Sequence, residues 1–215
     1  MLLLGVDALV FLEKEGFPVL RSHLARNEDE AAAQASEIDF PVTLKISSPE
    51  AIHKTEAKGI RVSLKDEIEV RQAFRELVES FTSSYPEKWL DGIIVQKQGG
   101  GLEVIVGMLR DQQFGPVLMF GLGGIFVEAM EDVSFRLIPI ETIDAKDMMQ
   151  ELKGYGVLRN PRSGPIDLAA VESFLYQTSR FIMNHPEIQE MDINPLFISP
   201  LGSGVQVCDA RIKVL

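Results

Sequence analysis

The chain has 215 residues and a formal net charge of -11, with 21 Lys and Arg against 32 Asp and Glu. This acidic balance argues against a nucleic-acid backbone as the main partner, because phosphates attract cationic surfaces. The hydrophobic content of 46% and charged content of 25% are those of a globular protein that can bury a core without disulfides.

Two features of the chain bear on its location. The single cysteine, Cys208, excludes an intrachain disulfide and fits a reducing cytoplasm. The opening run MLLLGVDALVFL is too short for a membrane span and contains Asp7. It has neither a basic region nor a small-residue cleavage site, so we expect no signal peptide, no membrane and a cytoplasmic protein.

The first part of the chain alternates strand-like and helix-like segments. Asn27 is an N-cap candidate with Glu30 three residues on, which predicts a helix over residues 28–38. Asp66, with Glu69 at the same spacing, predicts a second helix. Apolar runs predict strands at residues 17–20, 41–46 and 59–64.

The second part of the chain is richer in strands. Thr142 begins a short predicted helix and Asp167 caps a longer one. The near-continuous apolar runs predict a sheet that is covered on both faces. Strands are expected at residues 91–98, 102–109, 115–122 and 135–140, and a closing strand pair at 191–199 and 204–215. The segment SYPEKWLDG favours a boundary between an N-terminal lobe, residues 1–90, and a C-terminal lobe, residues 91–215.

Several familiar sites are absent from the sequence. It contains no G-x-x-x-x-G-K-[ST], no H-E-x-x-H, no cysteine cluster and no G-x-S-x-G. The segment FGLGG, residues 120–124, does not fit G-x-G-x-x-G. A P-loop, a structural zinc and a serine nucleophile elbow are therefore not expected.

Scattered polar residues remain as candidates, each with a plain structural alternative. Lys45 lies in an apolar strand, where it either meets an anion or points to water from an edge strand. His53 and Lys54 lie in a loop and are either functional or simply solvated. Gly123 and Gly124 either form a turn or let the backbone approach a phosphate closely.

The C-terminal segments EMDINPLFI and VCDARI carry oxygen donors. Asp192 and Asn194 are two residues apart, so they share one face of an extended segment, and Asp209 ends the next apolar run. Oxygen donors on two adjacent strands suit Mg²⁺ when nucleotide phosphates supply the remaining ligands. The alternative is that these residues cap turns.

Four stretches together closely resemble the β subunit of ADP-forming acetate–CoA (acyl-CoA) ligases, an ATP-grasp family related to the succinyl-CoA synthetase β chain. They are LKISSPEAIHKTE, GLEVIVGMLRDQQFGPVLMFGLGGIFVEAMEDVSFRLIPI, EMDINPLFI and DARI. The resemblance runs from about Gly16 to the C-terminus. It implies an α/β (α+β) ATP-grasp fold whose two lobes have mostly antiparallel sheets flanked by helices.

The resemblance also implies roles for individual residues. Lys45 and Lys54 would contact nucleotide phosphate, and the backbone from Val95 and Gln96 to Gln98 would read adenine. Glu103 would hold the ribose, and Gly123 and Gly124 would form the glycine loop. Asn194 and Asp209, with Asp192 beside them, would bind magnesium. His53 would carry a phosphoryl group between a partner subunit and ADP. Glu128 and Arg136 match family positions without an assigned task.

The implied reaction is acyl-CoA + ADP + phosphate ⇌ carboxylic acid + CoA + ATP, with Mg²⁺ as cofactor. The sequence has no CoA-binding Rossmann unit, so the resemblance implies a separate or fused CoA-binding α partner and a hetero-oligomer. Two departures from the family are Lys58 in place of a glycine and Lys97 in place of a frequent acid. The alternatives are a catalytically silent nucleotide-sensing module, as in regulatory fusions to acetyltransferases, and a scaffold that binds no ligand.

Overall fold

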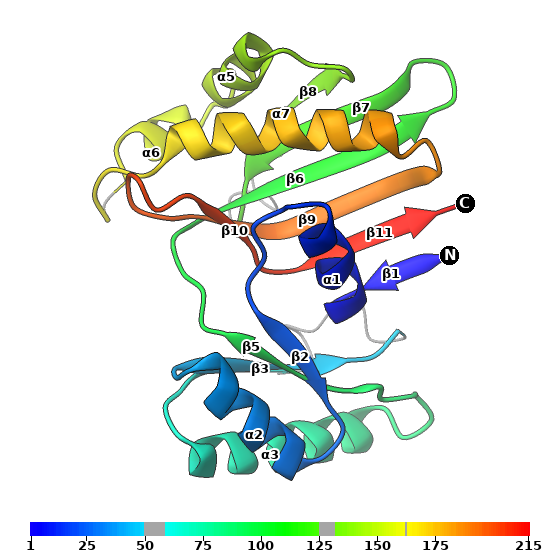
Figure 1. Cartoon of the computed structure of the whole chain (residues 1–215), viewed down its shortest axis with the longest axis vertical. Coiled ribbons are helices and arrows are strands. Elements are labelled where there is room, and N and C mark those ends of the chain that lie inside the picture. The colour runs from blue at the N-terminus through cyan, green and yellow to red at the C-terminus, as the bar shows by residue number, and fades with distance from the viewer. Residues whose placement is uncertain (50–58, 125–131, 162) are drawn as a thin grey trace. The chain divides into compact units, whose positions relative to one another are not determined.

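The structure is a computed structural model that describes residues 1–49, 59–124, 132–161 and 163–215. It divides into two compact units (Figure 1). The smaller unit is Leu20–Gln98, and the larger unit combines Met1–Val19 with Gly99–Leu215. This division differs from the predicted boundary after residue 90, because the next strand pairs within the smaller unit and the N-terminal segment pairs within the larger one.

The smaller unit has a four-stranded antiparallel sheet and two helices. The strand order is β2 (Ser22–Ala25), β5 (Gly92–Lys97), β3 (Val42–Ser47), β4 (Ile60–Leu64). The predicted strand over residues 17–20 is wrong. Among these described residues, Val19 forms only an isolated bridge to Val207, and strand pairing in β2 begins at Ser22.

Both helices of the smaller unit begin at their predicted caps. The Asn27 side chain accepts a hydrogen bond from the Glu30 amide at the start of α2 (Glu28–Ile38). Asp66 does the same for the Glu69 amide at the start of α3 (Glu67–Ser84). Apolar side chains of both helices pack on one face of the sheet and bury a core that includes Leu44, Ile93 and Phe81.

The larger unit is built on a seven-stranded antiparallel sheet. The strand order is β1 (Leu2–Leu4), β11 (Ala210–Val214), β9 (Ile188–Ile198), β6 (Leu102–Asp111), β7 (Gly115–Leu122), β8 (Val133–Leu137), and β10 (Val205–Val207) also pairs with β9. Because β1 pairs with β11, the start of the chain completes a sheet whose other strands come from its second half.

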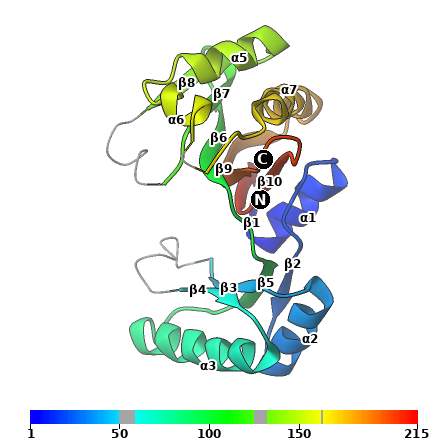
Figure 2. The ribbon, with the colours of Figure 1, turned by 90° about the vertical axis from the view of Figure 1, so that its left-hand side faces the viewer.

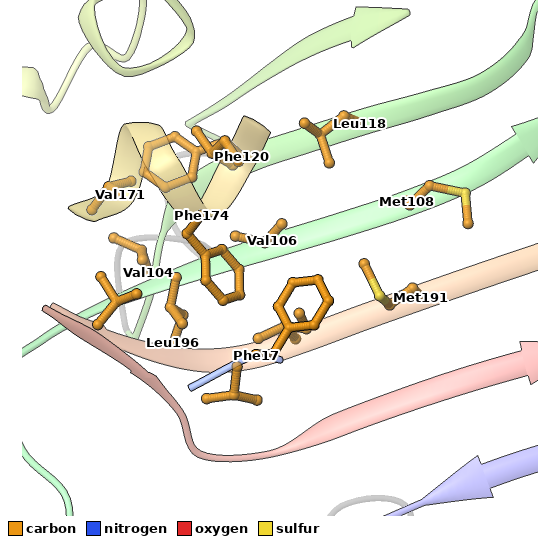
Figure 3. Packing of buried hydrophobic residues seen from close by; sticks show 14 of the residues in the cluster. Phe17, Val104, Val106, Met108, Leu118, Phe120, Val171, Phe174, Met191 and Leu196 are labelled. Atoms are coloured by element: carbon orange, nitrogen blue, oxygen red, sulfur yellow. The ribbon is translucent and has the colours of Figure 1, made fainter. Parts of the chain in front are cut away.

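Four described helices pack on this sheet: α1 (Val6–Lys14), α5 (Thr142–Gln150), α6 (Tyr155–Arg159) and α7 (Leu168–Asn184). Buried side chains from all four helices join one apolar cluster with alternate residues of the strands. Figure 3 shows Phe17 and Phe174 packed over Val104, Val106 and Leu196, and Figure 2 shows α1 and α7 on one side of the strands.

The opposite face of the larger sheet, which we call the open face, has no such cover from the described helices of its own unit. It carries the residues that alternate with the core positions. Gly107 pairs with Met119 and Asp192, and Met119 pairs with Phe135. Leu109 and Phe135 are each 54% exposed. In the described part of this unit, the predicted cover on both faces of the sheet is therefore not found, and part of the apolar character of these strands lies on a sheet surface.

Candidate functional site

Three oxygen-bearing side chains occupy neighbouring register positions on the open face. Asp192 and Asn194 lie on β9, and Asp209 directly precedes β11. The register pairs Asp192 with Arg211 and Ile193 with Ala210, which places Asn194 opposite Asp209. The backbone N–H of Asn194 donates a hydrogen bond to the backbone carbonyl of Asp209 at 3.1 Å. Directly opposed residues in such a ladder have Cβ atoms about 5 Å apart, so the two side chains can hold one ligand.

A β-bulge in β9 accounts for the placement of Asn194. Val104 pairs with Leu196 but Val106 pairs with Ile193, so β9 has one extra residue at Asn194 and Pro195, whose peptide bond is cis. The extra residue keeps both Ile193 and Leu196 fully buried in the core and leaves Asn194 exposed. Bulges of this kind commonly redirect a side chain beside a functional site.

The electrostatics of this cluster favour a cation. Desolvation by the surrounding protein atoms raises the pKa of the Asp192 carboxyl above its usual range, and the negative charge of Asp209 raises it further, while Arg211 acts in the opposite direction. Two carboxylates and one amide oxygen are hard donors of the kind that Mg²⁺ takes. Within the described ranges no group of three or more His, Cys, Asp and Glu forms a metal cluster, so two carboxylates with Asn194 are what the chain itself offers here.

Glu103 and the two candidate glycines also come together, at the end of the larger sheet where β6 begins. The Gly123 amide donates to the Glu103 carbonyl at 2.8 Å. A Cβ on Gly123 would lie 2.8 Å from backbone atoms of Glu103, and Gly124 has φ +65°. Both positions therefore require glycine for local backbone reasons, and Glu103 is held at this end of the sheet.

The remaining described candidates lie in the smaller unit. Lys45 is 8% exposed, and β3 has β5 on one side and β4 on the other, so the edge-strand alternative is wrong. Its side chain alternates with core residues Leu44 and Ile46 and therefore points away from α2 and α3. A lysine buried on the face of a central strand favours contact with an anion.

The two β5 residues predicted to read adenine are enclosed in the sheet. Val95 is fully buried in the core of the smaller unit, and Gln96 donates to the Ser22 hydroxyl at 2.8 Å. Both residues pair with β2 and with β3, so the ladders engage their backbone groups. The role of Val95 and Gln96 in reading adenine stays a prediction.

Lys97, which departs from the family pattern, and Arg136, which has no assigned role in the family, both make structural contacts. The Lys97 ammonium donates to the carbonyls of Asp39 and Phe40, at 2.9 and 3.3 Å, just beyond the end of α2. A cation is favourable there because of the helix dipole. Arg136 forms a two-pronged ion pair with Glu151 at 2.8 and 2.5 Å, which joins β8 to the end of α5.

Four predicted or noted residues lie outside the part of the chain that the structure describes. They are His53, Lys54, Lys58 and Glu128. Arg211, in contrast, is described by the structure but was not predicted as a site residue, although it lies on the open face beside Asp192. The period of two along DARIKV, counted from Asp209, was the signal that could have identified it.

A comparison with known protein families gives one match over nearly the whole chain. The ATP-grasp domain matches residues 1–214. The chain belongs to the ATP-grasp family. This membership confirms the predicted fold, an α/β arrangement of antiparallel sheets flanked by helices.

Relatives narrow this ATP-grasp assignment. The chain is 43% identical to the β subunit of ADP-forming acetate–CoA ligase I of Pyrococcus furiosus over 89% of its own length and 83% of that subunit. It is 40% identical to the ADP-forming acetate–CoA ligase I of Archaeoglobus fulgidus over 97% of its length, but spans only 30% of that longer protein. The chain is thus a member of the β-subunit family of ADP-forming acetate–CoA ligases.

Solved structures of one relative agree with this ATP-grasp assignment. The dinucleotide-forming acetyl-coenzyme A synthetase 1 of Ca. Korarchaeum cryptofilum, in complex with coenzyme A, Ca-AMPCP and HgCl⁺, matches with a TM-score of 0.93 and 43% identity, covering 100% of this chain and 93% of that chain. Its complex with coenzyme A and Mg-AMPPCP, in which a phosphohistidine segment points towards the nucleotide binding site, matches with a TM-score of 0.84 and 40% identity over the same shares. The helices in the described part of the ATP-grasp chain include none with the length and apolar character of a membrane span.

Proposed function

We propose that this chain is the nucleotide-binding subunit of an ADP-forming acyl-CoA ligase, which transfers a phosphoryl group between ATP or ADP and a histidine. The observation that carries this proposal is the meeting of Asp192, Asn194 and Asp209 on adjacent strands of an ATP-grasp chain. The 43% identity to a ligase β subunit supports it. The related enzymes favour a catalytic protein over a silent sensing module or a scaffold.

Asn194 and Asp209, with Asp192 beside them, are the residues that would hold Mg²⁺. When bound, Mg²⁺ would neutralise phosphate charge, the main requirement of phosphoryl transfer. The donor set fits because its oxygens are hard and because two neighbouring carboxylates favour a divalent cation. The related protein that was solved with Mg-AMPPCP supports the same assignment.

The family resemblance implies nucleotide contacts among the residues of both units. In the smaller unit, the buried Lys45 would contact phosphate. In the larger unit, Glu103 would hold the ribose, and its packing against Gly123 and Gly124 fixes its backbone for that task. We keep Lys54, Val95 and Gln96 as proposed nucleotide contacts on the family resemblance alone.

His53 is the proposed phosphoryl carrier. A neutral imidazole is a competent nucleophile near pH 7, because the unperturbed pKa of histidine is about 6.5. The phosphohistidine segment of the related structure supports this role. After incubation with labelled ATP, we expect acid-labile, base-stable label on the full chain and none on His53→Ala. Equal labelling of both proteins would remove the assignment and revive the silent-module alternative.

The acyl-CoA chemistry would require a CoA-binding α subunit or domain. The Archaeoglobus relative, of which this chain spans 30%, supports a fused arrangement in that protein. For this chain we propose such a partner in a hetero-oligomer. We expect the purified chain to bind Mg-nucleotide without making acyl-CoA. The cytoplasmic location stays a prediction.

A thermal-shift series with ADP and ATP, with and without Mg²⁺, tests the nucleotide site. At about 100 times its Kd, a nucleotide should stabilise the chain by about 2.7 kcal/mol, or about 5–10 °C in Tm. We expect Asp209→Asn and Asn194→Ala to lose the Mg²⁺-dependent part of this shift. Glu13→Gln, which removes one exposed charge from α1, is the matched control and should keep it. A wild-type chain that shows no shift with any nucleotide would reject the function.

A further inference from the structure

Arg211 lies on the open face next to the proposed metal site. It is the second residue of β11 and pairs with Asp192 across the ladder. Residues two apart on a strand share a face and lie about 6.6 Å apart, so Arg211 follows Asp209 along the same face. The guanidinium of an extended arginine side chain can cover that span.

The Arg211 guanidinium makes no hydrogen bond or ion pair with any group in the described ranges. Its neighbour along the strand differs in this respect, because the Lys213 ammonium is 2.9 Å from a Glu190 carboxylate oxygen. Arg211 acts on its neighbours only through the field of its charge, which opposes the rise in the pKa of Asp192 and adds to the Lys213 hydrogen bond that lowers the pKa of Glu190. Its five N–H donors are therefore available to a ligand.

A cavity of about 440 Å³ adjoins Arg211 on the open face. Asp192, Arg211 and Lys213 line one side, and Leu109, Met119 and Phe135 line the other. All of these residues belong to the larger unit. A phosphate group bound through Mg²⁺ at Asn194 and Asp209 would lie beside this cavity, and Arg211 would lie where the two adjoin.

The order of groups along the sheet indicates which part of a nucleotide Arg211 would meet. Glu103 pairs with Phe197 at one end of β9, Asn194 comes next, and Asp192 with Arg211 lies beyond. A nucleotide with its ribose at Glu103 and its metal at Asn194 would extend its phosphates along this line. The phosphate farthest from the ribose would then be the one nearest Arg211.

We propose that Arg211 binds the terminal phosphoryl group of the nucleotide, an inference that rests on the proposed function. During transfer, the bond from the terminal phosphorus to the bridging oxygen of ATP breaks and leaves ADP with the electron pair. A new bond forms from that phosphorus to the lone-pair nitrogen of a neutral imidazole. Arg211 stays charged throughout, because a guanidinium group is not deprotonated in proteins, and its paired N–H groups match two oxygens of the moving phosphoryl group. It acts through charge and orientation, as cations commonly do in phosphoryl transfer.

Isothermal titration calorimetry of the full chain with Mg-ADP and with Mg-AMPPCP, an analogue that keeps the terminal phosphoryl group, tests this assignment. We expect Arg211→Gln to bind Mg-AMPPCP about 10- to 100-fold more weakly than the wild type, the range for a lost hydrogen-bonded charge contact. Its affinity for Mg-ADP should stay within about twofold, because ADP lacks the group that Arg211 contacts.

Two further variants separate contact from structure. Arg211→Lys keeps the charge but loses the fork, so its loss for Mg-AMPPCP should fall between those of the wild type and Arg211→Gln. Lys213→Gln, on the same strand and face, should bind both nucleotides like the wild type. Equal weakening of both nucleotides by Arg211→Gln would show a structural role, and no weakening of either would also overturn the assignment. A wild type that binds neither nucleotide would reject the proposed function itself.

Discussion

The two units pack helices on one face of their sheets in the same way, but the other face of the sheet differs between them. Both bury one face of an antiparallel sheet under helices, in apolar clusters that contain Leu44 and Phe81 in the smaller unit and Phe120 and Phe174 in the larger one. On the other face, the smaller sheet buries polar side chains such as Lys45, whereas the larger sheet leaves Asn194 exposed. The helix-covered faces hold each unit together, and the faces without described helices carry the residues to which we assign a function.

The largest expected effect is the loss of stability when a buried phenylalanine is removed from the core of one unit or the other. Phe174 on α7 and Phe81 on α3 are 2% and 1% exposed, so Phe174→Ala and Phe81→Ala should each cost about 3–5 kcal/mol of unfolding free energy. If the units unfold separately, the fluorescence of Trp89, the single tryptophan and a residue of the smaller unit, should respond to Phe81→Ala far more than to Phe174→Ala.

Urea unfolding followed by Trp89 fluorescence and by far-UV circular dichroism makes this comparison. Exposed neighbours on the same helices are the controls: Met183→Ala on α7 and Ile68→Ala on α3, at 54% and 77% exposure, should change stability by less than about 0.5 kcal/mol. Coincident transitions in all variants would instead mean that the two units unfold as one cooperative body.

A smaller effect should come from the acidic cluster of the larger unit. The raised pKa of Asp192 means that folding disfavours its charged form, so its unfavourable contribution is absent at low pH and grows as pH rises from the unfolded pKa through the folded one. In metal-free buffer at pH 7, Asp192→Asn should therefore raise Tm by about 1–3 °C, and the gain should vanish near pH 3.

Asp111 provides a control of opposite sign for this experiment. Its carboxylate accepts hydrogen bonds from the amides of Phe114 and Gln113, which lower its pKa. Asp111→Asn should therefore reduce Tm at pH 7, where Asp192→Asn increases it. A decrease in both variants would contradict the account of Asp192.

The smallest effect should come from His185, at the end of α7. Burial opposes protonation of its ring, but hydrogen bonds to Glu187 at 2.9 Å and Glu15 at 3.3 Å outweigh burial and raise its pKa above 6.5. This stabilisation is fully present below pH 6.5 and is lost as pH rises through the folded pKa. We expect Tm to fall by about 1–2 °C from this source between pH 6 and pH 9, and the fall to disappear in His185→Gln. A pH dependence that is identical in His185→Gln would assign it to other groups.

Local sequence signals predicted much of each unit. The caps Asn27, Asp66 and Asp167 mark where helices begin, because a side-chain acceptor meets an unpaired amide three residues on. Alternation also predicted that Asp192 and Asn194 share a face, as the structure shows, and the long strands of the larger unit follow the apolar runs. These features depend on residues close together in the chain.

Features that depend on distant partners were missed. The segment of β1 and α1 gave no usable signal, because β1 is fixed by its pairing with β11. The true limits of the units, at residues 19–20 and 98–99, follow from such pairings and not from composition. The bulge at Asn194 and the packing of Gly123 on Glu103 likewise need a partner strand that local patterns do not identify.

The larger unit is formed by two separate segments of the chain, and this affects the order in which the two units can fold during synthesis. A ribosome synthesises β1 long before β11, so Leu3 must wait for Ile212 before its strand can pair. The smaller unit is continuous from Leu20 to Gln98 and can complete its sheet while translation continues. The nascent polypeptide would therefore hold a finished inner unit while the apolar residues of its first segment stay unpaired, a stage at which we expect aggregation to be the greatest hazard.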